Sequence, residues 1–159
     1  MEANKNTLVK FYTAFAFQDT AKMHECYHPK VQFRDPVFGL VKERSVFHMW
    51  EMLIERGKGN IKIEFSDIQT NEYTGSAQLI ATYHFSKTNR KVVNTIQAEF
   101  HFKDGLIIKH TDDFDLWEWS KQALGVKGVL LGWTGYFQKK IQQDAVTSLK
   151  EYQNKIHAN

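Results

Sequence analysis

The spacing of apolar residues changes at Ile61, and that change limits the possible fold more than any other feature. Before Ile61, apolar residues recur every three or four positions, as on one face of an α-helix. From Ile61 to Leu116 they alternate with polar residues, as in half-buried strands. Helices followed by an antiparallel meander predict an α+β fold in which the helices cover one face of the sheet.

The helical part of the sequence predicts three helices and one strand. Apolar stripes place the helices at about residues 8–16, 19–28 and 42–56, with Gly57 as the C-terminal stop of the third. Residues 31–35 alternate like a strand, which ends at a proline that cannot donate to a β-ladder. This first strand therefore lies between the second and third helices.

The alternating part of the sequence predicts four strands separated by turn residues. They begin at Ile61, Ala77, Val92 and Leu106, and a Lys-Asp-Gly turn joins the last two. Even-numbered positions carry most of the apolar residues of the last two strands, so we expect these positions to face the helices. In the last strand they are Leu106, Ile108, His110, Asp112, Phe114 and Leu116.

The rest of the chain predicts a helical tail. We expect residues 1–116 to form the main domain and residues 117–159 a C-terminal helical extension of the same domain, because no linker-like composition separates them. The final helix carries an apolar stripe from Phe137 to Ile156. That stripe must cover the mouth of the domain, its sheet, or a second copy of the chain, and we expect a homodimer.

Composition and charge exclude several classes of function. The net charge of +3 is small and scattered, so a nucleic-acid partner is not expected. A single cysteine, Cys26, excludes an internal disulfide. The N-terminus lacks the pattern of a signal peptide and no apolar run is long enough to span a membrane, so we expect a cytoplasmic protein with no membrane partner.

The segment before residue 40 resembles the nuclear transport factor 2-like superfamily. An amphipathic helix, an Asp19 that starts a second helix, and a strand that ends in Asp35-Pro36 before Gly39 are typical of these proteins. The resemblance covers roughly residues 5–116 and implies a cone-shaped α+β barrel, with three N-terminal helices packed on a curved antiparallel sheet. The superfamily holds isomerases, cyclases, hydrolases and non-catalytic modules, so the fold alone does not choose a function.

Two enzyme classes of this superfamily share short motifs with the chain. Residues 35–39 are similar to the general-base segment of ketosteroid isomerase, and polyketide cyclases have the same fold. The oxyanion-hole donors of the isomerase align with Phe11 and Ala98, which cannot donate, so we do not expect that activity. Residues 112–115 are similar to a stretch in epoxide hydrolases, whose Arg and Asp partners fall near Ile96 and Ala98, so that triad is incomplete.

Three acid–base residues remain as candidates for catalysis. Asp35 is either a general base or a turn-forming residue that accepts backbone N–H groups. His110 and Asp112 share one strand face, so they either satisfy each other or move a proton at a cavity. The predicted catalytic residues are Asp35, His110 and Asp112, and the predicted pocket residues are Tyr12, Trp50, Asn94 and Phe114.

No metal or other cofactor is expected. Residues 24–28 read His-Glu-Cys-Tyr-His and match a zinc-protease motif, but the mechanism needs both histidines on one helix, and Pro29 follows the second directly. We therefore expect a small hydrophobic molecule as ligand, with acid–base chemistry of a lyase, isomerase or hydrolase. The alternative is a non-catalytic binding or dimerisation module whose pocket is filled by its own side chains.

Overall fold

The computed structural model describes all 159 residues and confirms the α+β fold. Helices α1 (Glu2–Ala16) and α2 (Thr20–Glu25) come first, then strands β1 (Tyr27–Asp35) and β2 (Gly39–Lys42) and helix α3 (Arg44–Gly57). The meander consists of β3 (Lys62–Thr70), β4 (Thr74–Phe85), β5 (Arg90–Lys103) and β6 (Leu106–Asp113). The tail forms α4 (Leu116–Leu124), α5 (Val126–Leu131) and α6 (Gly135–Ala158).

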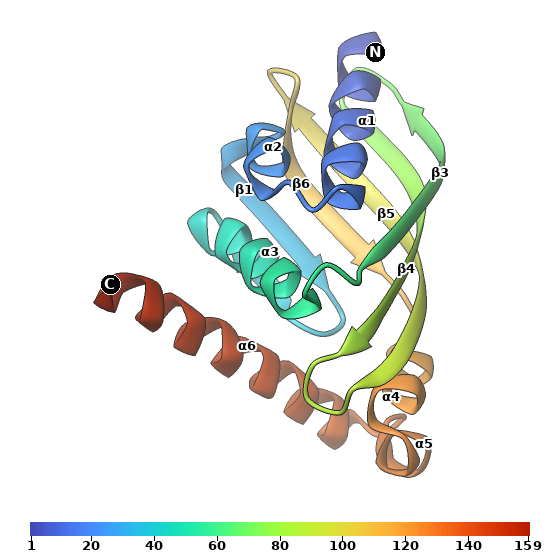
Figure 1. The fold of residues 1–159 in the computed structure, drawn as a ribbon. Helices are drawn as coiled ribbons and strands as arrows, with labels where there is room; N and C mark the ends of the chain where they lie inside the picture. The colour runs from blue at the N-terminus through green and yellow to red at the C-terminus, as the bar shows by residue number, and fades with distance from the viewer.

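The six strands form one curved sheet in the order β2-β1-β6-β5-β4-β3. The sheet curls around α1 and α3 without closing, and this gives the predicted cone shape (Figure 1). All pairings are antiparallel except that of β1 with β6, which is parallel. The parallel pairing follows from the chain path, because α3 and four strands separate β1 from β6.

One core fills the space between the helices and the inner face of the sheet. Alternate residues of β5 from Val92 to Phe102 are all buried. Leu8, Phe11 and Tyr12 of α1 are fully buried against this face. The predicted parity of β5 is therefore confirmed, and the apolar stripe of α1 is what holds that helix on the sheet.

The predicted parity of β6 is wrong at its N-terminal end. A bulge interrupts the β5–β6 ladder, so that His101 pairs with Lys109 but Phe102 pairs with Ile107. The extra residue reverses the facing of the strand before His110, and Ile107 is fully buried where Ile108 was expected. His110 and Asp112 lie beyond the bulge and keep the predicted inward facing.

The third helix also ends later than predicted. It continues through Gly57, and Lys58 takes the left-handed conformation that ends it, with φ of 49°. Met49 and Met52 are buried on this helix, whereas Phe47 and Leu53 are only partly buried. Strand β2, which the sequence did not suggest, pairs with β1 and extends the sheet edge.

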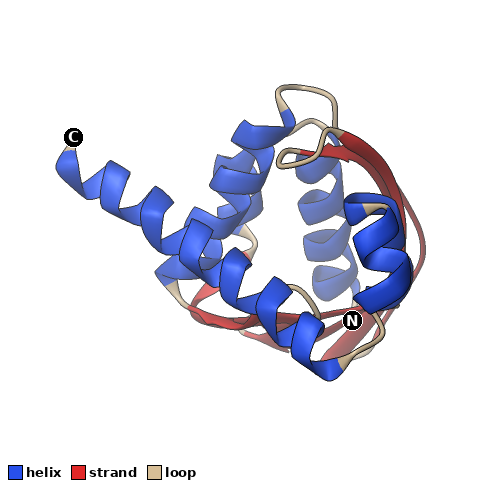
Figure 2. Ribbon diagram, turned by 90° about the horizontal axis from the view of Figure 1, so that it is seen from below, coloured by secondary structure: helices blue, strands red, loops and turns tan.

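The tail closes one end of the cone. Helix α6 packs against α3 and runs across the lower end of the molecule, and its last turns project beyond the body (Figures 1 and 2). Helix α5 lies close against α4. This close approach requires glycine at position 128, because a Cβ there would clash with the carbonyl oxygen of Ser120. No helix is both long and apolar enough to cross a membrane.

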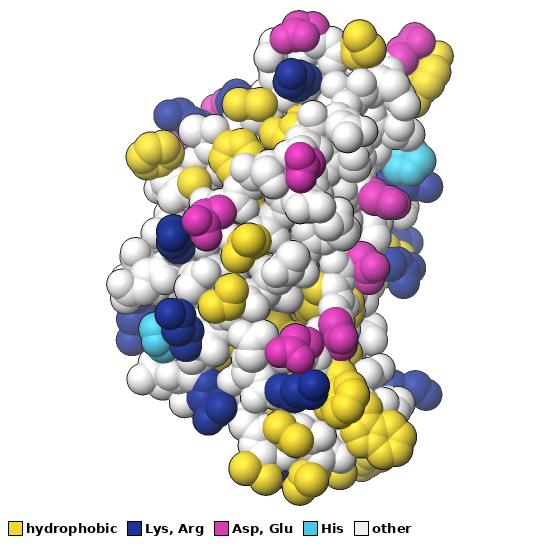
Figure 3. All heavy atoms as spheres, turned by 90° about the vertical axis from the view of Figure 1, so that its right-hand side faces the viewer, with side chains coloured by type: hydrophobic (Ala, Val, Ile, Leu, Met, Phe, Trp, Pro, Cys, Tyr) yellow, Lys and Arg dark blue, Asp and Glu magenta, His cyan; other side chains and the backbone are white.

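Apolar side chains are exposed at the same end of the molecule. They gather around α5, at the lower end in Figure 3, with charged side chains beside them. We call the exposed apolar residues of α5, the loop after it and the first turn of α6 the α5 patch. Its members are Val126, Val129, Leu130, Leu131, Trp133 and Tyr136.

Candidate functional site

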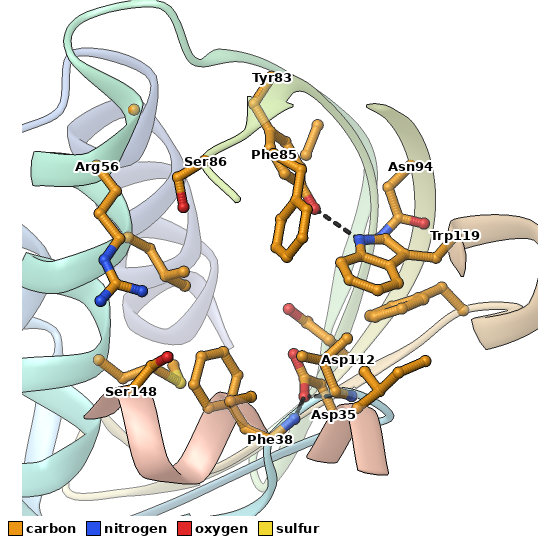
Figure 4. A pocket seen from close by; sticks show the side chains of 18 of the residues that line it. Asp35, Phe38, Arg56, Tyr83, Phe85, Ser86, Asn94, Asp112, Trp119 and Ser148 are labelled. Atoms are coloured by element: carbon orange, nitrogen blue, oxygen red, sulfur yellow. Dashed lines mark hydrogen bonds between the residues drawn. The ribbon is translucent and has the colours of Figure 1, made fainter. Parts of the chain in front are cut away.

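A cavity of about 370 Å³ lies between α3, the inner face of the sheet and the tail helices. Its walls are mostly apolar and include Phe33, Leu79, Ile96 and Phe137. Two carboxylates, Asp35 and Asp112, also line it (Figure 4). A volume of this size is that of a small-molecule site, and such sites combine apolar walls with a few polar groups.

Asp35 faces the cavity from the end of β1. Its Oδ1 atom accepts hydrogen bonds from the backbone N–H groups of Val37, at 2.9 Å, and Phe38, at 2.6 Å. The turn after β1 therefore fixes the carboxyl group in place, as the turn-forming interpretation predicted. Burial, assisted by the negative charge of Asp112 and opposed by the two N–H donors, raises the pKa of Asp35 to about 7.

A chain of buried hydrogen bonds leads from α3 to the second carboxylate. Trp50 donates its indole N–H to the hydroxyl of Tyr27, at 3.0 Å. The same hydroxyl lies 2.8 Å from Nδ1 of His110. On the other side of the ring, Nε2 of His110 lies 2.8 Å from Oδ1 of Asp112. All four side chains are nearly inaccessible, so these bonds are shielded from water.

The order of donors along this chain follows from counting protons. The Tyr27 oxygen already accepts a hydrogen bond from Trp50, and its own proton has one neighbouring acceptor, Nδ1 of His110. Because Nδ1 accepts this hydrogen bond, the N–H proton of the imidazole is on Nε2, which donates to Asp112. The three residues therefore orient the carboxylate of Asp112 at the cavity wall.

The structure places the predicted residues in two groups. Asp35, Asp112, Trp50, Asn94 and Phe114 line the cavity. His110 and Tyr12 do not. His110 lies behind the wall, between Tyr27 and Asp112, so it reaches the cavity only through its neighbours.

Tyr12 lies outside the cavity, although Phe15 of the same helix lines it, because the Tyr12 side chain packs directly against the sheet. Its ring stacks on Phe65, at 5.4 Å between centroids, and meets the edge of Phe100 at 6.1 Å. Its hydroxyl is buried and has no hydrogen-bond partner. The expectation that Tyr12 forms a helical wall of the cavity is therefore wrong.

Two polar groups on the sheet side of the cavity are free to bind an oxygen atom of a ligand. The side-chain amide of Asn94 makes no hydrogen bond to the protein, although the residue is buried at the cavity. The hydroxyl of Tyr83 accepts a hydrogen bond from the indole of Trp119, at 2.8 Å, and keeps its own proton (Figure 4). Burial raises the pKa of Tyr83 to about 12, so this proton stays in place at neutral pH.

Sequence reasoning missed Tyr83 and Trp119 as cavity residues. Tyr83 stands in an alternating strand, where it has the pattern of an ordinary core residue. Trp119 lies in the tail, and only the folded chain shows that α4 brings it to the sheet. The richness of the sequence in aromatic residues was the one available signal, and it does not say which of them line a cavity.

The zinc-protease motif does not have the geometry that its mechanism needs. Helix α2 ends at Glu25, so His24 is helical while His28 lies in β1. His24 stacks on Phe47, with 4.4 Å between centroids, and His28 accepts a hydrogen bond from the backbone N–H of Lys30. No group of three or more His, Cys, Asp or Glu side chains in the protein is arranged to hold a metal ion.

Comparison with known proteins agrees with this architecture. The model of the SnoaL-like domain matches residues 8–110, which is more than half of the chain. The chain belongs to the SnoaL-like domain family. The matched segment runs from α1 to His110, so it includes Asp35 and most of the cavity wall but not the tail helices. A search of curated proteins found no sequence match.

Solved structures with the same fold come from several kinds of protein. Bal32a, from a soil-derived mobile gene cassette, is 20% identical with a TM-score of 0.68, over 76% of the SnoaL-like chain and 96% of its own. A candidate polyketide cyclase from Xanthomonas campestris pv. campestris is 20% identical with a TM-score of 0.62, over the same shares. An "LEH-like" epoxide hydrolase from M. tuberculosis is 16% identical with a TM-score of 0.61, over 82% of this chain and 94% of its own. At these identities the likeness shows the fold alone.

The SnoaL-like chain lacks the donors of ketosteroid isomerase, as the sequence indicated. Phe11 is fully buried beneath the sheet, and Ala98 pairs directly with Asp112 across the β5–β6 ladder. On the sheet side of the cavity the free donors are Asn94 of β5 and Tyr83 of β4 instead.

Proposed function

We propose that this SnoaL-like protein binds a hydrophobic small molecule in the cavity and catalyses proton transfer on it, as an isomerase, cyclase or lyase does. The observation that carries the proposal is that two carboxylates from different strands line one apolar cavity. Acids in such a site exchange protons with a ligand more readily than acids in water, because their surroundings change their proton affinity.

The cavity supports ligand binding over the alternative of a filled module. Its volume of about 370 Å³ is not filled by the protein's own side chains. A self-filled pocket would have supported a purely structural role, because protein interiors close-pack when nothing has to enter them.

The roles of the two acids differ in the proposed reaction. Asp35 is the proton carrier, because its pKa of about 7 lets it give or take a proton near neutral pH. Asp112 is held by His110 and so has a fixed orientation toward the substrate. The amide of Asn94 and the hydroxyl of Tyr83 would stabilise negative charge that develops on a substrate oxygen.

The comparisons with solved structures support the proposal that the ligand is a small organic molecule. One structural neighbour is described as a candidate polyketide cyclase and another as an epoxide hydrolase, so this fold hosts chemistry on small organic molecules. Epoxide hydrolysis is the weaker choice for this chain, because Ile96 and Ala98 occupy the positions of the Arg and Asp that the sequence resemblance requires.

The proposal can be tested with 2-tetralone, an apolar bicyclic ketone with exchangeable protons beside its carbonyl group. We expect the protein to accelerate deuterium incorporation from D₂O, measured by NMR, with a rate that rises toward pH 7 as Asp35 ionises. Asp35→Asn should lower the rate by about 10²-fold or more. Asp104→Asn, at an exposed turn, is the matched control and should leave the rate unchanged.

The same experiment separates catalysis from binding alone. Ligand-observed NMR reports whether 2-tetralone binds. If it binds and exchanges no faster than in buffer, the catalytic part of the proposal is wrong and a binding module remains.

A further inference from the structure

Basic side chains surround the cavity where it opens to solvent. Four cations line it, each from a different segment of the chain, and all four are exposed. None has a carboxylate within ion-pair distance. We call these four residues the basic rim. Its members are Arg56 of α3, Lys87 of the β4–β5 turn, Lys127 of α5 and Lys140 of α6.

The interior of the cavity has the opposite charge. Asp35 and Asp112 lie at the inner wall, and Figure 4 shows Arg56 well apart from them on the α3 side. The exposed residues that line the cavity include four cations and a single acid, Asp144 of α6. The cavity therefore has an acidic end, apolar walls and a basic opening.

This distribution of charge fixes how a charged ligand can enter. An anionic group at the inner end would face two carboxylates and lose its hydration, so that orientation is unfavourable. At the rim the same group keeps contact with water and is attracted by cations that form no ion pair with a protein carboxylate. A cationic group at the rim would be repelled.

We infer that the natural ligand is an apolar compound that carries an anionic group, a carboxylate or a similar acid, and that it binds with this group at the basic rim. This inference rests on the proposed function and names its substrate class. The apolar body fills the cavity, and the part of the molecule opposite the anion reaches Asp35.

A matched pair of fluorescent probes tests the inference. The anion 8-anilinonaphthalene-1-sulfonate (ANS) and neutral N-phenyl-1-naphthylamine (NPN) share one aromatic skeleton and differ by the sulfonate. We expect ANS to bind more tightly by roughly 5- to 50-fold in low salt, the combined effect of several exposed charges. The advantage should shrink in 0.5 M NaCl, because salt screens exposed charges.

Variants of the rim locate the effect. The double variant Arg56→Gln/Lys140→Gln should remove most of the ANS advantage and leave NPN binding unchanged. Lys150→Gln, an exposed lysine of α6 outside the cavity lining, should change neither. Ala81→Leu fills the cavity from β4 and should weaken both probes, which shows that they bind inside it rather than on the α5 patch.

The outcomes keep the inference and the proposed function apart. If NPN binds as tightly as ANS, or if the rim variant affects both probes equally, the inference is wrong while cavity binding stands. If neither probe binds in the cavity and 2-tetralone does not exchange, the proposed function fails as well. An ANS advantage that Lys150→Gln also abolishes would reflect general surface charge and would overturn the inference.

Discussion

The carboxylate of Asp112 lies 2.8 Å from Nε2 of His110, two residues earlier on the same strand, and the pair is buried at the cavity wall. A strand places residues i and i+2 on one face, so this contact is local. The other nitrogen of the ring depends on distant residues, because Tyr27 and Trp50 come from β1 and α3. The tautomer of His110 is therefore set by tertiary contacts.

Removal of the Tyr27 hydroxyl should destabilise the protein. In Tyr27→Phe the indole N–H of Trp50 and Nδ1 of His110 both lose their partner in a buried site. We expect the free energy of unfolding to fall by about 1–3 kcal/mol, measured by urea denaturation. Tyr136→Phe removes a hydroxyl from an exposed residue and should have no effect. Equal stability of the two variants would contradict the hydrogen-bond chain.

The stability of the protein should depend on the ionisation of Asp35. Its pKa is about 7 in the folded state and near 3.8 in the unfolded chain, so the folded state binds the proton more tightly. The stability that this proton contributes is fully present below pH 4 and is lost as pH rises to about 7. In Asp35→Asn the side chain stays neutral at every pH. We therefore expect the free energy of unfolding of this variant to rise relative to that of the wild type between pH 4 and pH 7, by on the order of 1–4 kcal/mol.

Denaturation at pH 5 and pH 8 measures this effect. The carbonyl oxygen of the asparagine can still accept from Val37 and Phe38, so the turn is kept. Asp104→Asn, in an exposed turn, should follow the wild type at both pH values. A wild type that is more stable than Asp35→Asn by the same margin at both would show that the carboxyl is not perturbed.

The tail should be needed for a stable fold. Ile141 and Leu149 of α6 are buried, and α6 packs against α3. Deletion of the chain after Leu124 exposes the surface they cover and should cause aggregation or a large fall in the melting temperature. Deletion after Asn154 removes only exposed residues and should be tolerated. A soluble Leu124 truncation with an unchanged melting temperature would show that the tail is an independent appendage.

The homodimer stays a prediction, and the fold suggests where to test it. Alternate residues of the outer face of β5 are exposed and mostly polar, whereas the α5 patch is apolar, with Leu130 and Trp133 more than 60% exposed. Twofold pairing is the commonest way to cover such surface. Light scattering should give twice the chain mass of 18.6 kDa, and Leu130→Glu/Trp133→Glu should give the monomer. A wild-type monomer at micromolar concentration would refute the prediction.

The sequence determined the fold class and the facing of most strands. The period of two in β5 is a local property, since each residue's side is decided by its neighbours along the strand. For the same reason the sequence predicted that His110 and Asp112 face inward together. The turn after Asp35 is also local, because Pro36 follows Asp35 directly. The bulge at Ile108 escaped prediction, because it depends on how β6 pairs with β5.

Only the tertiary structure decided which inward residues meet the cavity. Tyr12 and Asn94 both point into the interior, but Phe65 and Phe100 of the sheet pack against Tyr12, whereas a cavity remains over Asn94. Tyr83 joins the site because α4 brings Trp119 to it, and no local pattern encodes a contact 36 residues apart. Periodicity reports the side of the sheet on which a residue lies, while cavities and hydrogen-bond partners arise from how separate segments fit together.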